Sequence, residues 1–252
     1  MKNEAAWRET KFVRRGGRLR ASTDLRDVIM GSRLTGDCIA RLYDEYLPRY
    51  AHGAAADLGC GTVPLYGAYR SHVSSVICVD WSNSAFETPH LDFECDLNGA
   101  LPLEDASLDT LILSDVLEHI ARPESLWAEM ARILRPGGVA FVNTPFFYWV
   151  HGEPYDYYRY TEFAHRRLAE QAGFEVLVME RIGGLLEVAC DVFAKSASAV
   201  PVVGNPIAAV AQGVVSAWSR SSPGRKVAHW SGRKFPLGYF LVARRLPAPP
   251  QP

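Results

Sequence analysis

Apolar residues follow two spacings along most of the chain. Short apolar runs at residues 54–58, 75–79 and 110–113 have the length and composition of buried strands. At residues 122–134, apolar positions instead recur every three or four residues, as they do on one face of a helix. This alternation indicates an α/β fold in which helices cover both faces of a parallel sheet. The same criteria predict further strands at 91–95, 139–143, 174–179 and 237–243. They also predict helices at 162–172 and between 24 and 50, and Pro48 is the expected end of the latter.

The chain ends and one internal segment depart from this alternation. Residues 1–20 are expected to be a poorly ordered, solvated arm that includes a basic run. Residues 185–232 are expected to form two short helices that cap the pocket, because Pro and Gly interrupt the uncharged stretch 196–219. Peripheral membrane contact or a dimer surface is the alternative for this stretch, and the oligomeric state stays open. The expected units are an N-terminal arm with helices (1–53), the core (54–184), a helical insertion (185–234), the last strand of the core (235–246) and a tail (247–252).

Composition narrows the classes of function. Of the 252 residues 48% are hydrophobic and 22% charged, with a formal net charge of −1, as in an ordinary soluble domain. A protein that binds nucleic acid through phosphate contacts is usually more basic, so no nucleic-acid partner is expected. The N-terminus has no apolar run typical of a signal peptide, which favours a cytoplasmic location. Five scattered cysteines without a CxxC spacing predict neither disulfides nor a metal site.

A glycine-rich turn follows the first strand, in Asp57-Leu58-Gly59-Cys60-Gly61. Glycine is needed there because a Cβ would block the turn and the approach of a ligand to backbone N–H groups. The third glycine of the dinucleotide-binding fingerprint is replaced by Pro64, which disfavours an NAD-linked oxidoreductase. Asp80, 21 residues after Gly59, ends the next strand, where a carboxylate can accept both hydroxyls of a ribose. Helix capping is an equally good explanation for Asp80 taken alone.

The order of these motifs resembles that of class I S-adenosylmethionine (SAM)-dependent methyltransferases. The segments 56–62, 101–109, 114–120 and 134–138 are similar to the type 11 group, within a resemblance that covers residues 54–182. The resemblance implies a Rossmann-like sheet of seven strands whose last strand, at 237–243, is antiparallel and inserted between the two preceding ones. It also makes the helical segment an insertion before that last strand. The sequence departs from the group's pattern at Thr62-Val63-Pro64, which puts the course of the loop in doubt.

The resemblance further implies SAM as methyl donor and S-adenosylhomocysteine as product. The cofactor contacts it assigns are Asp57, Gly59, Cys60 and Gly61 around the methionine moiety, Asp80 at the ribose, Asp96 and Leu97 at the adenine, and Ser114 near the sulfonium. Trp81, next to Asp80, has a ring that could cover one face of the adenine.

The acceptor side is less defined. The segment 151–161 follows the fifth strand, and its candidate acceptor contacts are Tyr155, Asp156, Tyr158 and Arg159. A structural loop is the alternative, with Asp156 and Arg159 paired and Thr161 capping the next helix. His119 and His151 are the candidate bases, since a hydroxyl acceptor must lose a proton. For His119 the alternative is packing, or a hydrogen bond to Glu118.

The segments 79–84, 96–98 and 154–161 resemble a bacterial branch of type 11 enzymes associated with cell-envelope polysaccharide or secondary-metabolite pathways. That likeness implies methyl transfer to a hydroxyl of a sugar or another small molecule. N- or C-methylation of a metabolite is the first alternative. A SAM-binding module without catalytic activity is the second.

Overall fold

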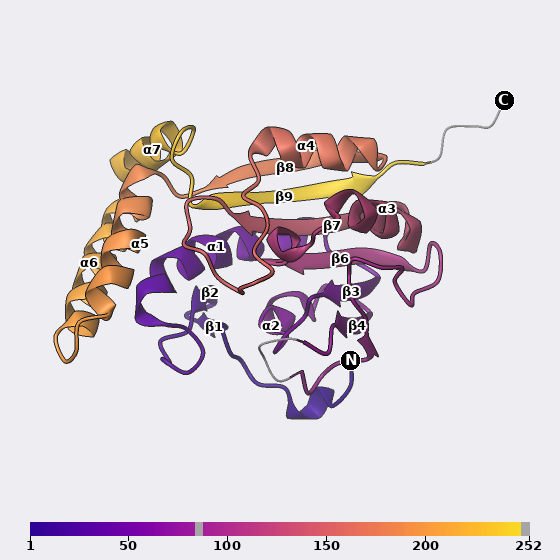
Figure 1. Ribbon diagram of the computed structural model, residues 1–252, viewed down its shortest axis with the longest axis horizontal. Coiled ribbons are helices and arrows are strands. Elements are labelled where there is room, and N and C mark those ends of the chain that lie inside the picture. Colours follow the sequence, from indigo (N-terminus) through magenta and orange to yellow (C-terminus); the bar gives the residue numbers. More distant parts are fainter. Residues whose placement is uncertain (84–87, 248–252) are drawn as a thin grey trace.

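The computed structural model describes residues 1–83 and 88–247. In this part of the chain, the sheet at the centre has seven strands in the order β5-β4-β3-β6-β7-β9-β8, with helices on both faces (Figure 1). β9 is antiparallel to both of its neighbours, and the other pairings are parallel, as predicted. The strands are β3 (Ala54–Leu58), β4 (Ser75–Asp80), β5 (Phe93–Glu94), β6 (Leu108–Ser114), β7 (Leu134–Pro145), β8 (Phe174–Ile182) and β9 (Gly238–Arg245).

Two apolar layers hold the helices to the sheet. On one face α3 (Pro123–Ile133) buries Leu126, Met130 and Ile133 of the predicted stripe, together with Trp127, and α4 (Glu162–Gln171) lies beside it. On the other face α1 (Arg33–Tyr50) and the short α2 (Tyr66–Tyr69) cover the sheet with buried aromatic rings. Burial on both faces explains why the central strands are continuous apolar runs.

The prediction of a disordered N-terminal arm is wrong. Residues 1–21 contain a 3-10 turn at Glu4–Ala6 and a hairpin of β1 (Phe12–Arg15) and β2 (Arg18–Ala21). Phe12 and Leu19 are buried among side chains of α1, so two apolar residues in the basic run anchor the hairpin. Its turn uses two glycines with positive φ, at positions 16 and 17.

Several element boundaries differ from the sequence analysis. α1 follows a 3-10 turn at Met30–Ser32 and continues past Pro48 to Tyr50. A proline in the last turn removes only one hydrogen bond, and Ala51 N still donates to Leu47 O at 2.9 Å. The third strand shrinks to Phe93–Glu94. β7 begins at Leu134, so the turn expected at 136–138 is instead the irregular start of a strand, beside a register shift in its pairing with β6.

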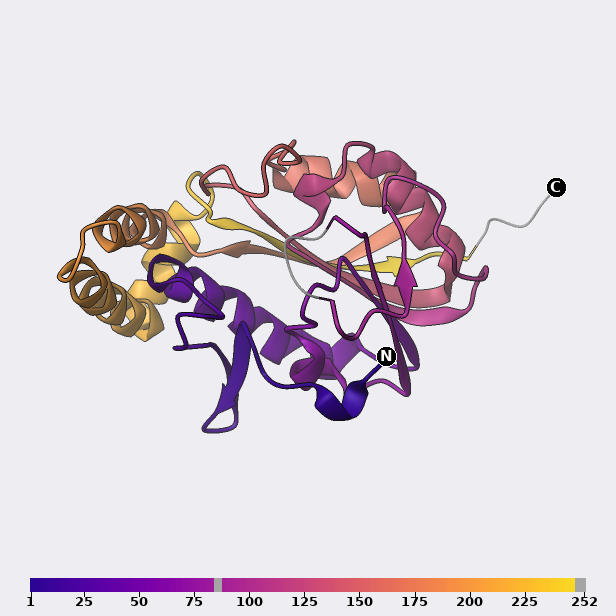
Figure 2. The same cartoon turned by 60° about the horizontal axis from the view of Figure 1, so that its bottom comes forward.

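The helical insertion holds three helices rather than two: α5 (Leu185–Ser198), α6 (Gly204–Arg220) and α7 (Ser222–Ser231). α7 begins separately because the Ser221 hydroxyl caps it by accepting from Gly224 N. The three helices form one end of the molecule, next to α1 (Figures 1 and 2). No helix among the described residues is long and apolar enough to cross a membrane. The expected tail lies outside the described residues apart from Pro247, as does Ser84 of the 79–84 motif.

Candidate functional site

The glycine loop lies where the parallel strands β3, β4 and β6 end at one edge of the sheet. Gly59 and Gly61 have φ of 70° and 50°, in the left-handed region that glycine adopts without strain. Gly59 N and Cys60 N both donate to Val79 O, at 2.8 and 3.2 Å, which ties the loop to β4. A Cβ at Gly59 would lie 2.6 Å from Val116 Cγ2, so the adjacent segment also demands glycine. Cys60 is a buried loop residue.

Asp80 connects β4 to this loop. Its Oδ2 accepts from Gly61 N at 2.7 Å, and its Oδ1 accepts from Trp81 N at 2.8 Å. Burial raises the pKa of Asp80, although the two N–H groups act in the opposite direction. Each carboxylate oxygen keeps a second lone pair that could accept a ribose hydroxyl.

Asp57 lies at the fourth position of β3, with 4% of its surface exposed. The Tyr69 hydroxyl of α2 donates to its Oδ2 at 2.9 Å. Burial raises the pKa of Asp57 to about 7, even though the hydrogen bond from Tyr69 favours the ionised form; the charge of Asp80 adds to the rise. A cation beside Asp57 would therefore stabilise a carboxylate that burial deprives of water.

The candidate adenine contacts lie after β4 and β5. Trp81 packs edge-to-face against Tyr155, with ring centroids 4.9 Å apart, so the 151–161 segment contacts the expected cofactor side of the edge. Asp96 is exposed, and its Oδ1 accepts from both the backbone and the side-chain amide of Asn98 at 2.9 Å. The Leu97 side chain is buried in the core.

The N-terminal arm crosses the glycine loop, which the sequence analysis missed. Thr10 Oγ1 lies 3.2 Å from Thr62 Oγ1, and Lys11 Nζ forms an ion pair with Asp115 Oδ2 at 2.7 Å. Asp115 follows Ser114, the half-buried last residue of β6. A hollow of about 170 Å³ lies between the arm and the loop, lined by Ala6, Arg8, Thr10, Thr62, Pro89 and His90. No motif spacing could reveal a pair 104 positions apart.

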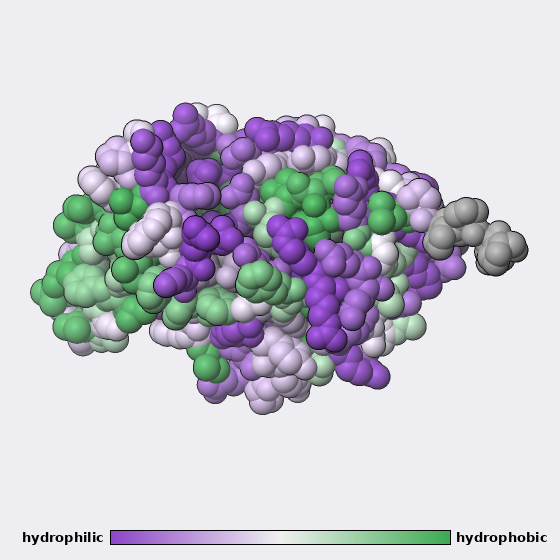
Figure 3. Space-filling model, turned by 90° about the horizontal axis from the view of Figure 1, so that it is seen from above, coloured by the Kyte–Doolittle hydropathy of each residue, from purple (hydrophilic) through white to green (hydrophobic). Residues whose placement is uncertain are grey.

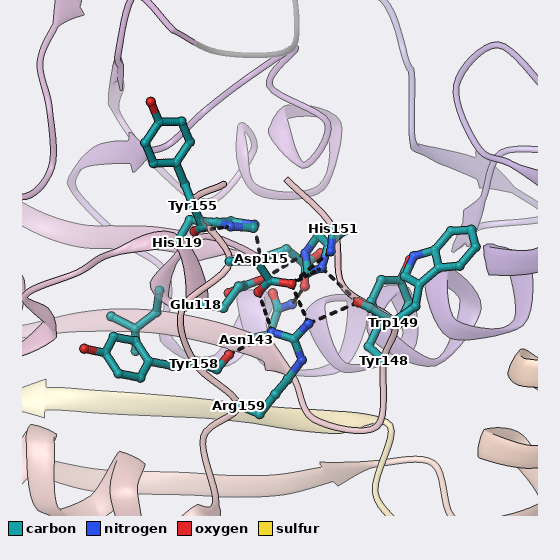
Figure 4. Close-up of polar contacts among 12 residues, drawn as sticks. Asp115, Glu118, His119, Asn143, Tyr148, Trp149, His151, Tyr155, Tyr158 and Arg159 are labelled. Atoms are coloured by element: carbon teal, nitrogen blue, oxygen red, sulfur yellow. Dashed lines mark hydrogen bonds and ion pairs between the residues drawn. The ribbon is translucent and has the colours of Figure 1, made fainter. Parts of the chain in front are cut away.

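The two candidate bases meet at a buried carboxylate. Glu118 is fully buried, and neither of its carboxylate oxygens has a hydrogen-bond partner among the described residues. Its Oε1 lies 3.6 Å from His151 Nε2 and 3.9 Å from His119 Nε2. The two imidazoles pack edge-to-face at 4.8 Å, and both face Glu118 (Figure 4). Their alignment over one unpaired carboxylate is the main feature of the acceptor side.

The two histidines differ in what their other nitrogen contacts. His119 Nδ1 lies 3.0 Å from Tyr155 O, so in the neutral ring Nδ1 donates and Nε2 keeps the lone pair. His151 Nδ1 lies 3.4 Å from Asp156 Oδ2, which places carboxylate oxygens at both of its nitrogens. Burial disfavours the charged ring of His151, but Glu118 and Asp156 outweigh it and raise the pKa. His151 is therefore suited to carry a proton, whereas the neutral ring of His119 keeps a lone pair on Nε2.

The 151–161 segment has the pairing expected of a structural loop. Asp156 and Arg159 form a bidentate pair at 2.5 and 2.7 Å, and the hydrogen bond from Arg159 lowers the pKa of Asp156 to about 2. The Thr161 hydroxyl caps α4 by accepting from Ala164 N. The Tyr158 hydroxyl donates to Ala121 O at 3.1 Å, and its ring borders a hollow of about 300 Å³ lined by Tyr148, Val150 and residues 156–159. The proposed acceptor contacts remain predictions.

The structure also assembles a donor set that the sequence analysis did not anticipate. Ligand atoms of Glu118, His119 and His151 all lie within 4.8 Å of one another, a separation from which they could hold a metal ion. One carboxylate and two imidazoles suit divalent transition metals. The same atoms also suit the proton-carrying arrangement described above.

Comparison with known proteins agrees with this architecture. The type 11 family model described as a methyltransferase domain matches residues 56–142, from the glycine loop through most of β7. A probable S-adenosylmethionine-dependent methyltransferase of Mycolicibacterium smegmatis is 32% identical over 116 residues, which cover 42% of this chain and 44% of that protein. The chain thus aligns with less than half of the length of the curated relatives it matches.

Solved structures share the fold at low identity. A geranyl diphosphate methyltransferase in complex with SAM has a TM-score of 0.54 at 15% identity, covering 89% of this chain and 93% of that one. The [4+2]-cyclase SpnF has a TM-score of 0.53 at 18% identity, covering 95% and 87%. The glycine loop and the sheet edge lie inside the matched segment. Residues 56–142 are therefore similar to the type 11 methyltransferase domain, within a chain that has the fold of solved methyltransferases.

Proposed function

We propose that the protein transfers the methyl group of SAM to a hydroxyl of a small molecule, a sugar or a secondary metabolite. The observation that carries the proposal is the group formed by His119, His151 and the buried Glu118, at the same sheet edge as the glycine loop. A hydroxyl acceptor needs a proton acceptor beside the cofactor, whereas a more nucleophilic amine or carbanion needs it less.

For the donor, we propose that Gly59 and Gly61 admit the methionine moiety to the backbone and that Asp80 accepts from the ribose. Asp57 would face the ammonium group of SAM, which would favour its ionised form. Cys60 and Ser114 would line the same space. Trp81, Asp96 and Leu97 would surround the adenine. The hydrogen bond from Gly61 N to Asp80 supports this grouping, because it couples the ribose carboxylate to the loop.

For the transfer, bound SAM would supply an activated methyl group, which would pass to the acceptor oxygen while the electron pair of the carbon–sulfur bond stayed on sulfur. The hydroxyl proton goes to His119 Nε2, whose orientation the Tyr155 carbonyl fixes through Nδ1. Glu118 stabilises the imidazolium that forms. His151 acts as the positioned partner of Glu118 and Asp156 rather than as the first proton acceptor.

For the acceptor, we propose that Tyr155 and Tyr158 supply contact surface and that Asp156 and Arg159 hold their loop in place. Sugars and secondary metabolites are proposed from the resemblance to the bacterial branch. N- or C-methylation is the alternative within methyl transfer. A protein of the same fold is named a cyclase, so this fold also carries other chemistry, and cofactor binding must be measured apart from transfer.

Binding is tested by calorimetry with SAM, S-adenosylhomocysteine and NAD. We expect affinity for both sulfur nucleotides, a loss of at least tenfold in Asp80→Asn, and no change in Asp105→Asn. Asp105 is the matched control because it is exposed before β6 begins, at the opposite edge of the sheet. Binding of NAD alone would refute the proposal.

Transfer is tested with methyl-labelled SAM and a panel of hydroxylated sugars and phenols. We expect His119→Gln to lower kcat by about 10²–10⁴-fold with little change in the Kd for SAM, and His72→Gln, before β4, to leave both unchanged. Labelling of amines only, or equal kcat in His119→Gln and the parent, would refute hydroxyl transfer through His119.

A further inference from the structure

The part of the helical insertion after α5, with the short segment that leads to β9, is positively charged, whereas the rest of the chain has a net negative charge. Residues 196–236 contain five Lys or Arg residues and no Asp or Glu. Since the chain has 27 basic and 28 acidic residues in all, the remainder holds 22 basic and 28 acidic ones. The five cations are exposed and form no ion pair with another described residue: Arg220, Arg225, Lys226, Arg233 and Lys234. This end of a nearly neutral protein is therefore strongly cationic.

The same helices expose an apolar stripe. Ile207, Val210, Val214 and Trp218 follow one another at helical spacing along α6 and are between 43% and 68% exposed. A different side of α6 packs on the domain, where the Gln212 side chain accepts from Leu34 N at 2.8 Å. The stripe is therefore not the face that holds α6 to the protein. Figure 3 shows apolar residues gathered at this end of the molecule.

The loop before α6 extends the stripe. Val202 is 93% exposed and has a φ of 66°, a conformation that β-branched residues rarely adopt, and Val200 and Val203 beside it are half exposed. Exposed Trp230 of α7 and Phe235 after it enlarge the apolar surface. A backbone strained to present a valine to solvent points to a partner that covers it.

We propose that α6, α7 and the loop before α6 dock on the surface of a bilayer that contains anionic phospholipid. Valine and isoleucine side chains would enter the acyl boundary, the indoles would lie at headgroup depth, and the five cations would contact phosphates. A second copy of this chain is a poor partner for this surface, because such a dimer would place the five unpaired cations of one copy opposite the same five of the other. The contact is peripheral, since α6 lacks the length and hydropathy to span a bilayer.

The docking surface continues to the candidate site. Phe235 packs against Phe147 with ring centroids 5.9 Å apart, and the exposed Trp149 and Val150 lead directly to His151. Lys195 of α5 lies over the Tyr148 ring at 3.4 Å, which fixes the insertion to this segment. A docked protein would therefore hold the acceptor side of its sheet edge close to the lipid surface.

The test is co-sedimentation of the full chain with vesicles of phosphatidylcholine, with or without phosphatidylglycerol. It needs no cofactor or acceptor, so its failure is separate from failure of the proposed methyl transfer. We expect binding only to the anionic vesicles, weakened by salt, and a blue shift of tryptophan fluorescence that Trp218→Phe and Trp230→Phe reduce. Arg225→Glu with Lys226→Glu should lower the partition coefficient roughly thirtyfold or more. Val202→Asp with Val210→Asp should abolish sedimentation.

The controls lie on α4, at another part of the surface. Arg166→Glu with Arg167→Glu changes two adjacent exposed cations, and Phe163→Asp changes a 74% exposed aromatic residue. Neither should alter vesicle binding. Equal losses in the α4 controls would overturn the proposal, as would failure to sediment with anionic vesicles. A self-association that Val210→Asp abolishes, without vesicle binding, would assign the surface to a dimer instead, and capture of an acidic protein without vesicle binding would assign it to that partner.

Discussion

Gly59→Ala tests why the first glycine of the loop is required. In nucleotide-binding loops, a glycine at such a position lets the ligand come close to the backbone N–H groups. The geometry gives a second cause that acts without ligand, since a Cβ at this position would meet Val116 Cγ2 at 2.6 Å and Cγ1 at 2.9 Å, and the φ of 70° disfavours any side chain. We therefore expect the variant to be destabilised even in the absence of SAM.

The magnitude follows from two contributions. An alanine in the left-handed conformation costs about 1–2 kcal/mol. Forcing a methyl group against a buried, packed valine costs about 1–3 kcal/mol. The free energy of unfolding should thus fall by roughly 2–5 kcal/mol, and since each kcal/mol lowers the Tm of a chain of this size by about 2–4 °C, the loss should exceed the error of thermal unfolding several times.

A double-mutant cycle separates the two contributions. Val116→Ala removes both methyl groups that the new Cβ would meet, so the loss caused by Gly59→Ala should be smaller in the Val116→Ala background by about 1–3 kcal/mol. Urea unfolding of the parent, the two single variants and the double variant, all without SAM, gives this coupling. Additive losses, within about 0.5 kcal/mol, would show that the Val116 contact does not impose the glycine.

Three further expectations concern charges at the site. The pKa of Asp57 is about 7 in the folded protein and about 3.9 in an unfolded chain, so folding disfavours the ionised form and stability should fall as the pH rises between these values. The Tm of the ligand-free protein should therefore fall with pH over this range, and Asp57→Asn should make that dependence weaker. An unchanged dependence in the variant would contradict the assignment. Glu118→Gln should lower the pKa of His151 in NMR titrations, since the carboxylate raises it; an unshifted titration would exclude the contact. Lys11→Met should break the ion pair with Asp115 and speed hydrogen exchange at residues 7–15 at least tenfold, whereas unaltered exchange would show that other contacts hold the arm.

Local patterns predicted the elements that local residues determine. β3 is predicted residue for residue because a short, mostly apolar run precedes a glycine turn. α3 is predicted because Leu126, Met130 and Ile133 recur at helical spacing and are buried. The pair of Asp156 and Arg159 was also foreseeable, since its members are three positions apart. The strand order follows from no pattern of this kind. It came from the family resemblance, because the insertion of β9 between β7 and β8 joins segments that no short-range spacing relates.

What the sequence analysis missed depends on contacts between distant segments. The basic run of the arm looked solvated because the burial of Phe12 and Leu19 depends on α1, which begins after the hairpin. His119 and His151 were each chosen as a base, but their meeting at Glu118 depends on how the segment after β7 folds back. The cationic character of the insertion was visible in the sequence, yet only the structure separates the face of α6 that packs from the face that is exposed.

The unpaired carboxylate of Glu118 decides how the acceptor side should be understood. A fully buried carboxylate without a hydrogen bond costs several kcal/mol unless a cation compensates it. Burial raises the pKa of Glu118, which reduces that cost only by removing the charge. The two imidazoles within 4 Å offer compensation that varies with their own protonation. His151 shares its charge between Glu118 and Asp156, so Glu118 can still act as a counter-charge for His119. If His119 takes the acceptor's proton, the new positive charge forms beside a carboxylate that is already in place. A site that merely held the 151–161 segment would be better served by a hydrogen-bonded neutral side chain at position 118.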